Sequence, residues 1–315
     1  MIVVTGGAGF IGSNVIVELN RCGRDDIVVV DDLTDGRKAL NLSACRIGDY
    51  IDRDECLRCL EAGGDLAPQV DCVIHLGACS DTTEWNGRYM METNYRFSRV
   101  LFEYCVARGI GLVYASSAAV YGAGTRFIET PACEHPLNVY GYSKLAFDQF
   151  VRRRLPGVES LVIGLRYFNV YGPREAHKGR MASVVHHFAS QLRATGELNL
   201  FGASHGYAPG EQRRDFIHVD DVVAVTLWCA KQPASASGIY NCGTGEAATF
   251  NAVARQIIAV LGGGAIRYRD FPDDLRAAYQ ASTQADLSRL RALGYTDDFR
   301  DVTQGIEEYL RWLAS

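Results

Sequence analysis

The sequence predicts an α/β protein with a doubly wound parallel sheet and a smaller α/β domain. Short apolar runs alternate with helix-like segments over the first 168 residues, and a glycine-rich turn follows the first run. Alternation at this spacing implies right-handed crossovers between parallel strands. Beyond residue 168 the alternation weakens, the loops lengthen and glycines cluster at 202–210 and 262–264. This change of pattern indicates the second, smaller unit.

Each expected element of the sheet domain rests on its own pattern. Apolar, β-branched runs predict strands at 2–5, 27–31, 70–76, 111–116 and 160–166. The segments between them predict helices at 10–20, 53–60, 87–108 and 140–153. A further helix is expected at 181–194, and 215–231 is expected to return to the sheet. We therefore predict one domain at 1–168 plus about 213–240, and another at about 169–212 plus 241–315.

Composition excludes several classes of protein. The chain has 315 residues, 48% of them hydrophobic, and a net charge of -5, which disfavours nucleic acid or an anionic membrane as partner. No apolar run approaches the roughly 20 residues of a membrane span. The amino terminus lacks a basic segment and enters a glycine-rich turn at once, unlike a signal peptide, so we expect a cytoplasmic protein.

The cysteines predict no metal site. Ten cysteines are scattered along the chain, and the one Cys-x-x-Cys pair, Cys56 and Cys59, has no second pair to complete a zinc site. Free cysteines pack as small hydrophobic residues. We therefore expect reduced, mostly buried thiols.

The glycine-rich turn predicts a dinucleotide site. Gly6, Gly9 and Gly12 lie between the first strand and the first helix. In the Rossmann pattern the first glycine allows the turn, the second admits the pyrophosphate, and the third lets helix and strand pack closely. The phosphates then lie against the positive end of the helix, beside Phe10 and Ile11. The larger domain is therefore predicted to bind NAD or NADP.

The sequence leaves the choice between NAD and NADP open. Asp31 and Asp32 end the second strand, where a carboxylate suits the ribose hydroxyls of NAD and repels the 2′-phosphate of NADP. Arg37, Lys38 and Arg53 follow, and each could instead bind that phosphate or lie on a solvated loop.

Tyr140 and Lys144 predict hydride chemistry. Four residues apart on a helix, their side chains share one face. A free phenol has a pKa near 10, and a neighbouring ammonium together with an oxidised nicotinamide favours phenolate. Ser116 and Ser117 end the preceding strand. We assign Ser116 as the hydroxyl that hydrogen-bonds the reacting oxygen.

Together these blocks resemble the extended short-chain dehydrogenase/reductases, which mostly modify nucleotide-linked sugars. The blocks, in chain order, are TGGAGFIG at 5–12, HLGA at 75–78, SSAAVYG at 116–122, YGYSK at 140–144, RYFNVYGPR at 166–174 and RDFIHVDDV at 214–222. Narrower blocks at 77–85, 89–91, 174–183, 271–272 and 279–280 are similar to the branch that epimerises an ADP-linked heptose for the lipopolysaccharide core. The resemblance runs from Met1 to Trp312.

The resemblance implies an oxidation and re-reduction at C6″ of ADP-D-glycero-D-manno-heptose, giving the L-glycero-D-manno epimer. A tightly bound dinucleotide, NADP rather than NAD, would be recycled within each turnover. Inversion exchanges the position of the hydroxyl, so two acid–base groups are useful. Tyr140 would be the first and Lys178 the second, while Lys144 tunes Tyr140. An amine acts as a base only when neutral, so burial must lower the pKa of Lys178.

The remaining site residues are also implied by the resemblance. The cofactor would be contacted by Asp31, Asp32, Lys38, Arg53, His75, Leu76, Gly77, Ala78, Cys79, Asn94, Val170 and Lys178, in addition to the glycine turn, Tyr140 and Lys144. The substrate would be contacted by Asn169, Arg180, His187, Phe201, Ser204, Arg214 and Tyr279. Arg180 departs from the branch, some members of which carry a serine there. Arg214 suits a diphosphate, and its alternative role is an ion pair with Asp215.

Three rival functions remain. A UDP-sugar 4-epimerase would need Tyr140 but not Lys178, and a net oxidoreductase on a nucleotide sugar would consume external cofactor. A redox-sensing regulator would bind NADP without turnover, although such proteins usually lose the tyrosine or the lysine. The resemblance also implies a homo-oligomer, a pentamer.

Overall fold

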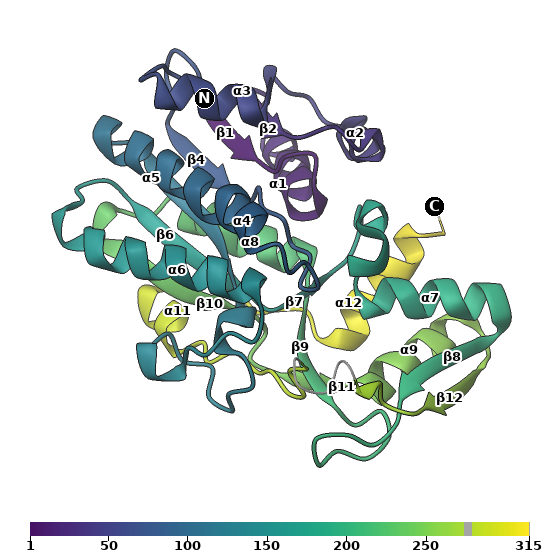
Figure 1. The fold of residues 1–315 in the computed structure, drawn as a ribbon. Helices are drawn as coiled ribbons and strands as arrows, with labels where there is room; N and C mark the ends of the chain where they lie inside the picture. The colour runs from purple at the N-terminus through teal and green to yellow at the C-terminus, as the bar shows by residue number, and fades with distance from the viewer. Residues whose placement is uncertain (274–278, 315) are drawn as a thin grey trace.

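The computed structural model describes residues 1–273 and 279–314, in which the largest sheet has seven parallel strands (Figure 1). From edge to edge these are β10 (Gly238–Cys242), β6 (Val162–Tyr167), β5 (Gly111–Ser117), β4 (Cys72–His75), β1 (Ile2–Thr5), β2 (Ile27–Asp31) and β3 (Asp49–Asp52). Every neighbouring pair is parallel. The chain starts in the middle, runs to one edge and crosses back to the other half. The predicted fold class is confirmed.

The strands β3 and β10 were not predicted. β3 reads Asp-Tyr-Ile-Asp and lies at the edge of the sheet, where it is only partly buried, so it shows no apolar run. β10 is fully buried but contains an asparagine and a glycine, which weaken its strand pattern. Both strands are specified by pairing with a neighbour distant in the sequence.

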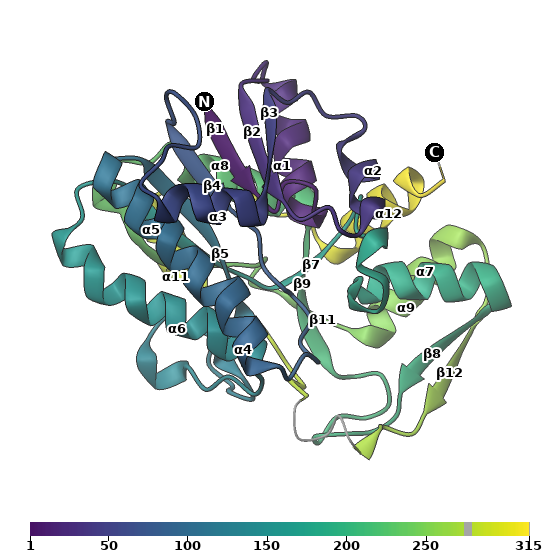
Figure 2. The same cartoon turned by 45° about the horizontal axis from the view of Figure 1, so that its top comes forward.

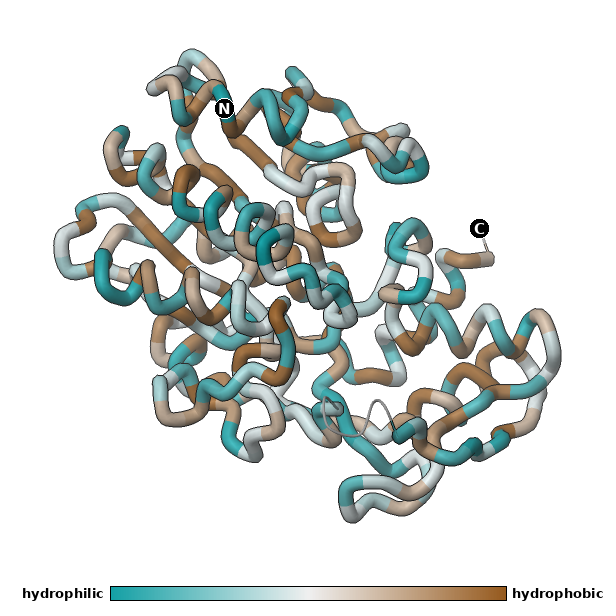
Figure 3. The backbone as a smooth tube through the Cα atoms, viewed as in Figure 1, coloured by the Kyte–Doolittle hydropathy of each residue, from teal (hydrophilic) through white to brown (hydrophobic). Residues whose placement is uncertain are grey.

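Helices cover both faces of the sheet (Figures 1 and 2). On one face α1 (Phe10–Arg21) packs against α8 (Val219–Cys229), where Val15 and Ile16 meet Val219 and Val223. The other face is covered by α3 (Arg53–Glu61), α5 (Phe97–Arg108) and α6 (Val139–Arg154). Figure 3 shows the strands between these layers mostly in hydrophobic colours. Among the described residues, no helix is both long and apolar enough to span a membrane.

The helix predicted at 87–108 is interrupted. It consists of α4 (Gly87–Met90), a π-helical segment at Met91–Arg96, and α5. A π-turn inserts an extra residue in the helix and often occurs at functional sites. Here the π-helical segment carries the buried Asn94.

The smaller unit contains two small sheets, with strand orders β11-β9-β7 and β12-β8 within the described residues. Their strands are β7 (Asn169–Tyr171), β9 (Arg213–His218), β11 (Ala247–Thr249), β8 (Glu197–Phe201) and β12 (Ala265–Arg269). Three helices pack on them: α7 (Val184–Thr195), α9 (Phe250–Leu261) and α12 (Val302–Trp312). The helix expected at 181–194 is therefore present as α7.

The chain returns to the large sheet near its carboxyl end. α11 (Ser288–Leu293) packs beside β10, and Leu290 and Tyr295 share a core with Ile163 and Val222. The predicted limits had assigned this stretch to the smaller domain, since nothing in its local pattern indicates a long-range return. The division into two domains stays a prediction.

A buried ionic network lies between α6 and the sheet. The carboxylate of Asp148 accepts hydrogen bonds from Arg166 Nε and Nη2 at 2.9 and 2.8 Å, from Tyr114 at 3.0 Å and from Ser116 at 2.9 Å. Arg166 also pairs with Glu134 at 2.6 Å. The side chains of Asp148 and Arg166 are fully buried. The network joins β5, β6 and α6, the elements that carry the catalytic candidates.

We expect Asp148→Asn to lower the free energy of unfolding by about 3 kcal/mol, because the buried guanidinium of Arg166 loses one of its two countercharges and keeps only Glu134. Urea unfolding followed by circular dichroism measures the change. Glu103→Gln is the control, since Glu103 forms an exposed pair with Arg99 on α5 and should contribute no more than about 0.5 kcal/mol. Equal losses in the two variants would contradict this prediction.

Candidate active site

The glycine turn forms a cradle of the shape that a pyrophosphate needs. Gly6 has φ +67°, and a Cβ there would lie 2.6 Å from the backbone nitrogen of Gly77. A Cβ on Gly12 would lie 2.1 Å from the carbonyl oxygen of Gly6, so any side chain would force the helix away. Gly9 begins α1 and provides no side-chain cap to its first turn. The positive end of α1 is therefore open to an anion, which fits the predicted dinucleotide.

The two acids at the end of β2 differ in their surroundings. Asp31 is buried; it accepts a hydrogen bond from the amide of Ala8 at 2.8 Å and forms an ion pair with Lys38 Nζ at 2.6 Å. Asp32 is partly exposed, and hydrogen bonds from Thr34 lower its pKa, assisted by the charges of Arg53 and Lys38. Lys38 and Arg53 thus converge on the same strand end.

Arg37 points elsewhere. Its guanidinium pairs with Asp35 at 2.6 Å, and both side chains are largely exposed. Of the three basic residues considered for a 2′-phosphate, Arg37 is therefore the one that the structure places on a solvated turn.

The end of β4 lies against the glycine turn. Two residues predicted to contact the cofactor there, His75 and Asn94, use their side chains for hydrogen bonds within the fold. His75 is buried, with Nδ1 2.6 Å from Thr5 Oγ1 and Nε2 2.8 Å from Ser98 Oγ. Burial lowers its pKa to about 3, so the ring is neutral. Both ring nitrogens are therefore engaged within the fold, and the cofactor contact of His75 stays a prediction. Leu76, Gly77 and Ala78 follow it and are partly exposed.

The side chain of Asn94 holds the loop after β4 in place by hydrogen bonds. Its side chain bonds the Cys79 amide at 2.8 Å, the Cys79 carbonyl at 2.9 Å and Ser143 Oγ at 3.0 Å. It is 1% exposed, so its polar atoms are used within the fold. The predicted cofactor contact of Asn94 is therefore indirect. Cys79 lies close enough to Tyr140 to influence its pKa.

Tyr140 and Lys144 begin α6 on one face, as predicted. Burial raises the pKa of Tyr140, and a hydrogen bond with Ser117 opposes that shift. Lys144 is buried and donates from Nζ to the carbonyl of Ala115 at 2.9 Å. Phenol, ammonium and hydroxyl thus converge at the end of β5.

The hydroxyl that faces Tyr140 belongs to Ser117, so the assignment of Ser116 is wrong. Successive side chains on a strand point to opposite faces. Ser116 points into the core and donates to Asp148, whereas Ser117 is partly exposed and adjoins Tyr140. Sequence alone could not decide which of two adjacent serines faces the helix.

Lys144 makes stability depend on pH. Burial lowers its pKa from 10.5 to about 8, and the charge of Asp148 opposes that shift. The folded state therefore binds fewer protons than the unfolded state between about pH 8 and 10.5, and gains stability as the pH rises through this range. Relative to Lys144→Met, the wild type should gain at most about 3 kcal/mol.

Urea unfolding of the dinucleotide-free protein at stepped pH measures this gain. Subtracting the Lys144→Met curve removes the contribution of other titrating groups. A difference that stays flat, or that falls with rising pH, would contradict the shift.

Lys178 lies in a 3₁₀ segment, Ala176–Met181, between β7 and α7. Its Nζ is 5.4 Å from the centre of the Phe10 ring, at the start of α1, so the amine reaches the glycine cradle from the smaller unit. Burial lowers the pKa of Lys178, and the charge of Glu175 opposes that shift. The direction is the one that a lysine base requires. Val170, on β7, is partly buried between the two core clusters beside the sheet.

Arg214 lies on β9 in an aromatic pocket. Its guanidinium carbon is 4.8 Å from the Tyr279 ring centre and 5.6 Å from that of Phe250. Burial lowers the pKa of Arg214, and the charge and hydrogen bond of Tyr279 oppose that shift. Across 1–273 and 279–314, no carboxylate pairs with it. The alternative ion pair with Asp215 is wrong, because that carboxylate accepts from the amides of Thr244, Gly245 and Ala285.

Aromatic rings surround this guanidinium. Phe201 lies 6.3 Å from Tyr279 and 5.0 Å from Phe271, measured between ring centres. Phe271 was not predicted as a site residue, although it begins one of the blocks of resemblance. A buried cation among aromatic rings suits a nucleotide diphosphate.

The other residues predicted to contact the substrate differ in how far their side chains are already engaged within the fold. Asn169 is exposed on β7, and His187 lies 3.3 Å from the Arg180 carbonyl. Ser204 is buried and accepts from Gln212 at 2.8 Å, which leaves its hydroxyl engaged in the fold. Arg180 Nη2 pairs with Asp81 at 2.5 Å. The predicted substrate contacts of Ser204 and Arg180 are therefore not supported by their present partners.

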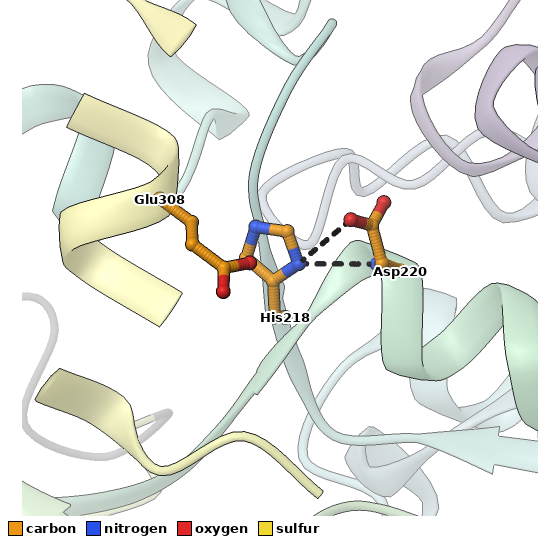
Figure 4. A group of neighbouring side chains, drawn as sticks. All are labelled: His218, Asp220 and Glu308. Atoms are coloured by element: carbon orange, nitrogen blue, oxygen red, sulfur yellow. Dashed lines mark hydrogen bonds and ion pairs between the residues drawn. The ribbon is translucent and has the colours of Figure 1, made fainter. Parts of the chain in front are cut away.

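A second polar cluster lies away from the cradle. His218, Asp220 and Glu308 gather where β9 meets α8 and α12 (Figure 4). His218 Nδ1 accepts from the Asp220 amide at 3.2 Å and caps α8, while Arg300 Nε donates to Glu308 at 2.8 Å and Nη1 pairs with Asp221. The guanidinium already supplies the positive charge among these carboxylates. The group is a helix cap with an ion-pair cluster.

Comparison with known proteins agrees with this geometry. Residues 2–243 match the model of the NAD dependent epimerase/dehydratase family. A relative from Alkalilimnicola ehrlichii, an ADP-L-glycero-D-manno-heptose-6-epimerase, is 59% identical over 314 residues, covering 100% of this chain and 98% of the relative.

Two solved structures extend the comparison. The Helicobacter pylori ADP-L-glycero-D-manno-heptose-6-epimerase has 33% identity and a TM-score of 0.83, covering 100% of this chain and 96% of its own. The Thermus thermophilus UDP-glucose 4-epimerase in complex with NAD has 26% identity and a TM-score of 0.80, covering 98% and 97%. These matches support a nicotinamide cofactor and confirm the resemblance to nucleotide-sugar epimerases. The chain belongs to the NAD dependent epimerase/dehydratase family.

Proposed function

We propose that the protein inverts C6″ of ADP-D-glycero-D-manno-heptose to give ADP-L-glycero-D-manno-heptose, a donor for the lipopolysaccharide core. The observation that carries this proposal is a second acid–base candidate, Lys178, beside the glycine cradle, in addition to Tyr140 on α6. Tyr140 lies at the start of α6, and Lys178 comes from the smaller unit and lies against Phe10. The 59% identity to the Alkalilimnicola ehrlichii enzyme supports this substrate. A 4-epimerase of UDP-sugars would have no use for Lys178.

The residues then divide the reaction between them. A dinucleotide held at the glycine cradle would supply reversible hydride transfer at C6″. Tyr140 accepts the proton of the C6″ hydroxyl, and Ser117 holds that oxygen. The ketone end of the sugar turns over, and Lys178 donates a proton to the oxygen in its new position. Each turnover leaves Tyr140 protonated and Lys178 neutral, so a proton must pass between them through solvent.

Lys144 prepares Tyr140 for this role. Burial raises the pKa of the phenol in the absence of dinucleotide, which opposes ionisation. The Lys144 ammonium and the cationic nicotinamide together favour the phenolate. We infer that Tyr140 becomes a base only when the oxidised dinucleotide is bound.

We further propose that the dinucleotide is NADP, held tightly between turnovers. Lys38 and Arg53 support it, since both are near the ends of β2 and β3, where a 2′-phosphate would lie. Lys38 would move from Asp31 to the phosphate. Family members in complex with NAD keep the alternative open to test.

Lys38→Ala should weaken NADP binding by about 10- to 100-fold and leave NAD binding nearly unchanged, since a hydrogen bond to a charged group is lost with NADP only. Fluorescence titration of dinucleotide-free protein measures both affinities. Arg37→Ala is the control, because Arg37 is engaged with Asp35. Equal weakening of NAD and NADP would contradict the assignment.

The ADP portion of the substrate is proposed to bind in the aromatic pocket. Arg214 would contact the diphosphate, with Tyr279 and Phe201 beside it. Asn169, on β7, and His187, beside the Arg180 carbonyl, would contact the heptose. Arg180 and Ser204 would need to leave Asp81 and Gln212 to reach the substrate.

One experiment tests the function. The purified protein receives ADP-D-glycero-D-manno-heptose without added cofactor, and the C6″ configuration is followed by NMR. Inversion supports the proposal. Absence of inversion together with turnover of UDP-galactose would establish the 4-epimerase alternative, and a requirement for stoichiometric cofactor would indicate a net oxidoreductase.

We also propose a cytoplasmic homo-oligomer, a pentamer by resemblance to the epimerase branch. The net charge of -5 and the nucleotide-sugar substrate fit the cytoplasm. Analytical ultracentrifugation would give the number of subunits, and a mass other than five chains would replace the pentamer.

A further inference from the structure

Lys178 is carried on a strap, residues 173–183, that crosses from the smaller unit to the dinucleotide cradle. In Figures 1 and 2 the segment leading into α7 rises toward α2 (Ala39–Leu42). Its first residues are tied to α1: Asn14 Nδ2 donates to the Pro173 carbonyl at 2.9 Å, and Arg174 Nη1 donates to Asn14 Oδ1 at 3.1 Å. Glu175 closes the strap on itself by accepting from Ser183 Oγ at 2.7 Å.

The strap is fastened on both sides of Lys178. On one side His177 Nδ1 lies 3.0 Å from Asn41 Nδ2, and Asn41 also donates to the carbonyl of Ala8 in the glycine turn. On the other side Arg180 Nη2 contacts Asp81 Oδ2 at 2.5 Å. Gly179, with φ +53°, reverses the chain between the two fastenings. Lys178 therefore sits between one tie to the glycine turn and one tie to the loop after β4.

The Asp81 end of the second tie is oriented by hydrogen bonds within its own loop. Asp81 Oδ1 accepts from the amide of Thr83 at 2.8 Å and from its hydroxyl at 2.7 Å, which leaves Oδ2 directed at Arg180. The loop that carries Asp81 is itself held at Cys79 by Asn94. The side chain of Asp81 is 25% exposed, and that of Arg180 is 71% exposed.

We propose that Asp81 is a positioning residue for the second acid–base group, because its pair with Arg180 holds the strap so that Lys178 stays over the cradle. This inference rests on the proposed function of Lys178. It assigns Arg180 to the strap rather than to the substrate. The pair joins residues 99 positions apart and connects the large sheet to the smaller unit beside the reaction site.

The position of the pair separates catalysis from stability. An exposed ion pair contributes little to the folded state. Its loss should therefore leave the melting temperature unchanged while Lys178 samples unproductive positions. Small displacements of a catalytic group reduce the rate without changing substrate affinity.

A double-mutant cycle tests the proposal. Asp81→Asn and Arg180→Gln should each lower kcat by about fivefold, the most that an exposed pair allows, with KM unchanged. The double variant should lose no more than either single one. Glu197→Gln is the matched control: it removes an exposed pair with Arg267, at 3.0 Å, between β8 and β12, and should keep wild-type kcat.

Limited trypsin digestion gives a readout independent of turnover. In Asp81→Asn the bonds after Lys178 and Arg180 should be cleaved about fivefold faster, because the strap leaves the cradle more often. Glu197→Gln should be cleaved there at the wild-type rate. Faster cleavage with an unchanged melting temperature places the effect in the strap.

The outcomes are distinguishable. Additive losses in the double variant, or an increase in KM for Arg180→Gln alone, would overturn the proposal, the latter by making Arg180 a substrate ligand. Unchanged kcat and cleavage in Asp81→Asn would overturn it as well. If Lys178→Met keeps wild-type activity, the two-base function itself has failed. If Lys178→Met is inactive and Asp81→Asn is normal, only the positioning role has failed.

Discussion

Tyr140→Phe should lower kcat for C6″ inversion by about 10²- to 10⁴-fold, the range that general acid–base catalysis contributes. The substitution removes the hydroxyl and keeps the ring, so the packing at the start of α6 remains. The neighbouring groups remain too, because Lys144 is held by the Ala115 carbonyl and not by the phenol. NMR of the substrate measures the rate, and the dinucleotide content of the purified variant shows that the cofactor is retained.

Tyr142→Phe is the matched control. It removes a phenol two positions along the same helix, on a side chain that is 55% exposed. We expect wild-type kcat for this variant. Comparable losses in the two variants would mean that α6 is merely sensitive to substitution, and substantial activity in Tyr140→Phe would remove this residue from the chemistry.

Lys178→Met should also lower kcat by about 10²- to 10⁴-fold, since in the proposed mechanism Lys178 protonates the sugar oxygen in its second orientation. Methionine keeps the apolar stem against Phe10 and removes the amine. The variant should still oxidise the sugar by way of Tyr140. The absorbance of the reduced dinucleotide formed on adding substrate measures the oxidation, and NMR of the recovered substrate measures the inversion.

Lys231→Met serves as the control for Lys178→Met. Lys231 is exposed at the end of α8, so its loss should leave kcat unchanged. If Lys178→Met turns over at the wild-type rate, inversion uses a single acid–base group, and the rival 4-epimerase chemistry gains support.

The parts of the site that depend on local sequence were predictable. Gly6 and Gly12 could be recognised from the sequence because the turn admits no Cβ at either position. Tyr140 and Lys144 could be recognised because helical spacing places them on one face. The strands β1 and β2 show as apolar runs since both faces are buried.

The parts of the site that depend on residues distant in the sequence were not predictable. Ser116 was chosen over Ser117 because adjacent positions on a strand differ only in face, and the face is set by Asp148 on another element. The side chains of His75 and Asn94 could bind a cofactor, but in the fold their polar atoms are already hydrogen-bonded. His75 is bonded to Thr5, and Asn94 to Cys79.

Ion pairs on the surface could not be predicted from the sequence either. Arg180 could be recognised as a departure from the epimerase branch, but nothing in the sequence indicates that its partner is Asp81, which lies in the block at 77–85. The edge strand β3 belongs to the same class, since its pairing with β2 supplies what its composition lacks.

The buried amines have a practical consequence for chemical labelling. The chain contains only the lysines Lys38, Lys144, Lys178 and Lys231. Because burial lowers the pKa of Lys144 and Lys178, these two amines carry a larger neutral, nucleophilic fraction near neutral pH than an exposed lysine does. A small acylating reagent that reaches these two amines would thus mark the reaction centre, and their protection in a peptide map would report occupancy by a ligand, without an assay of turnover.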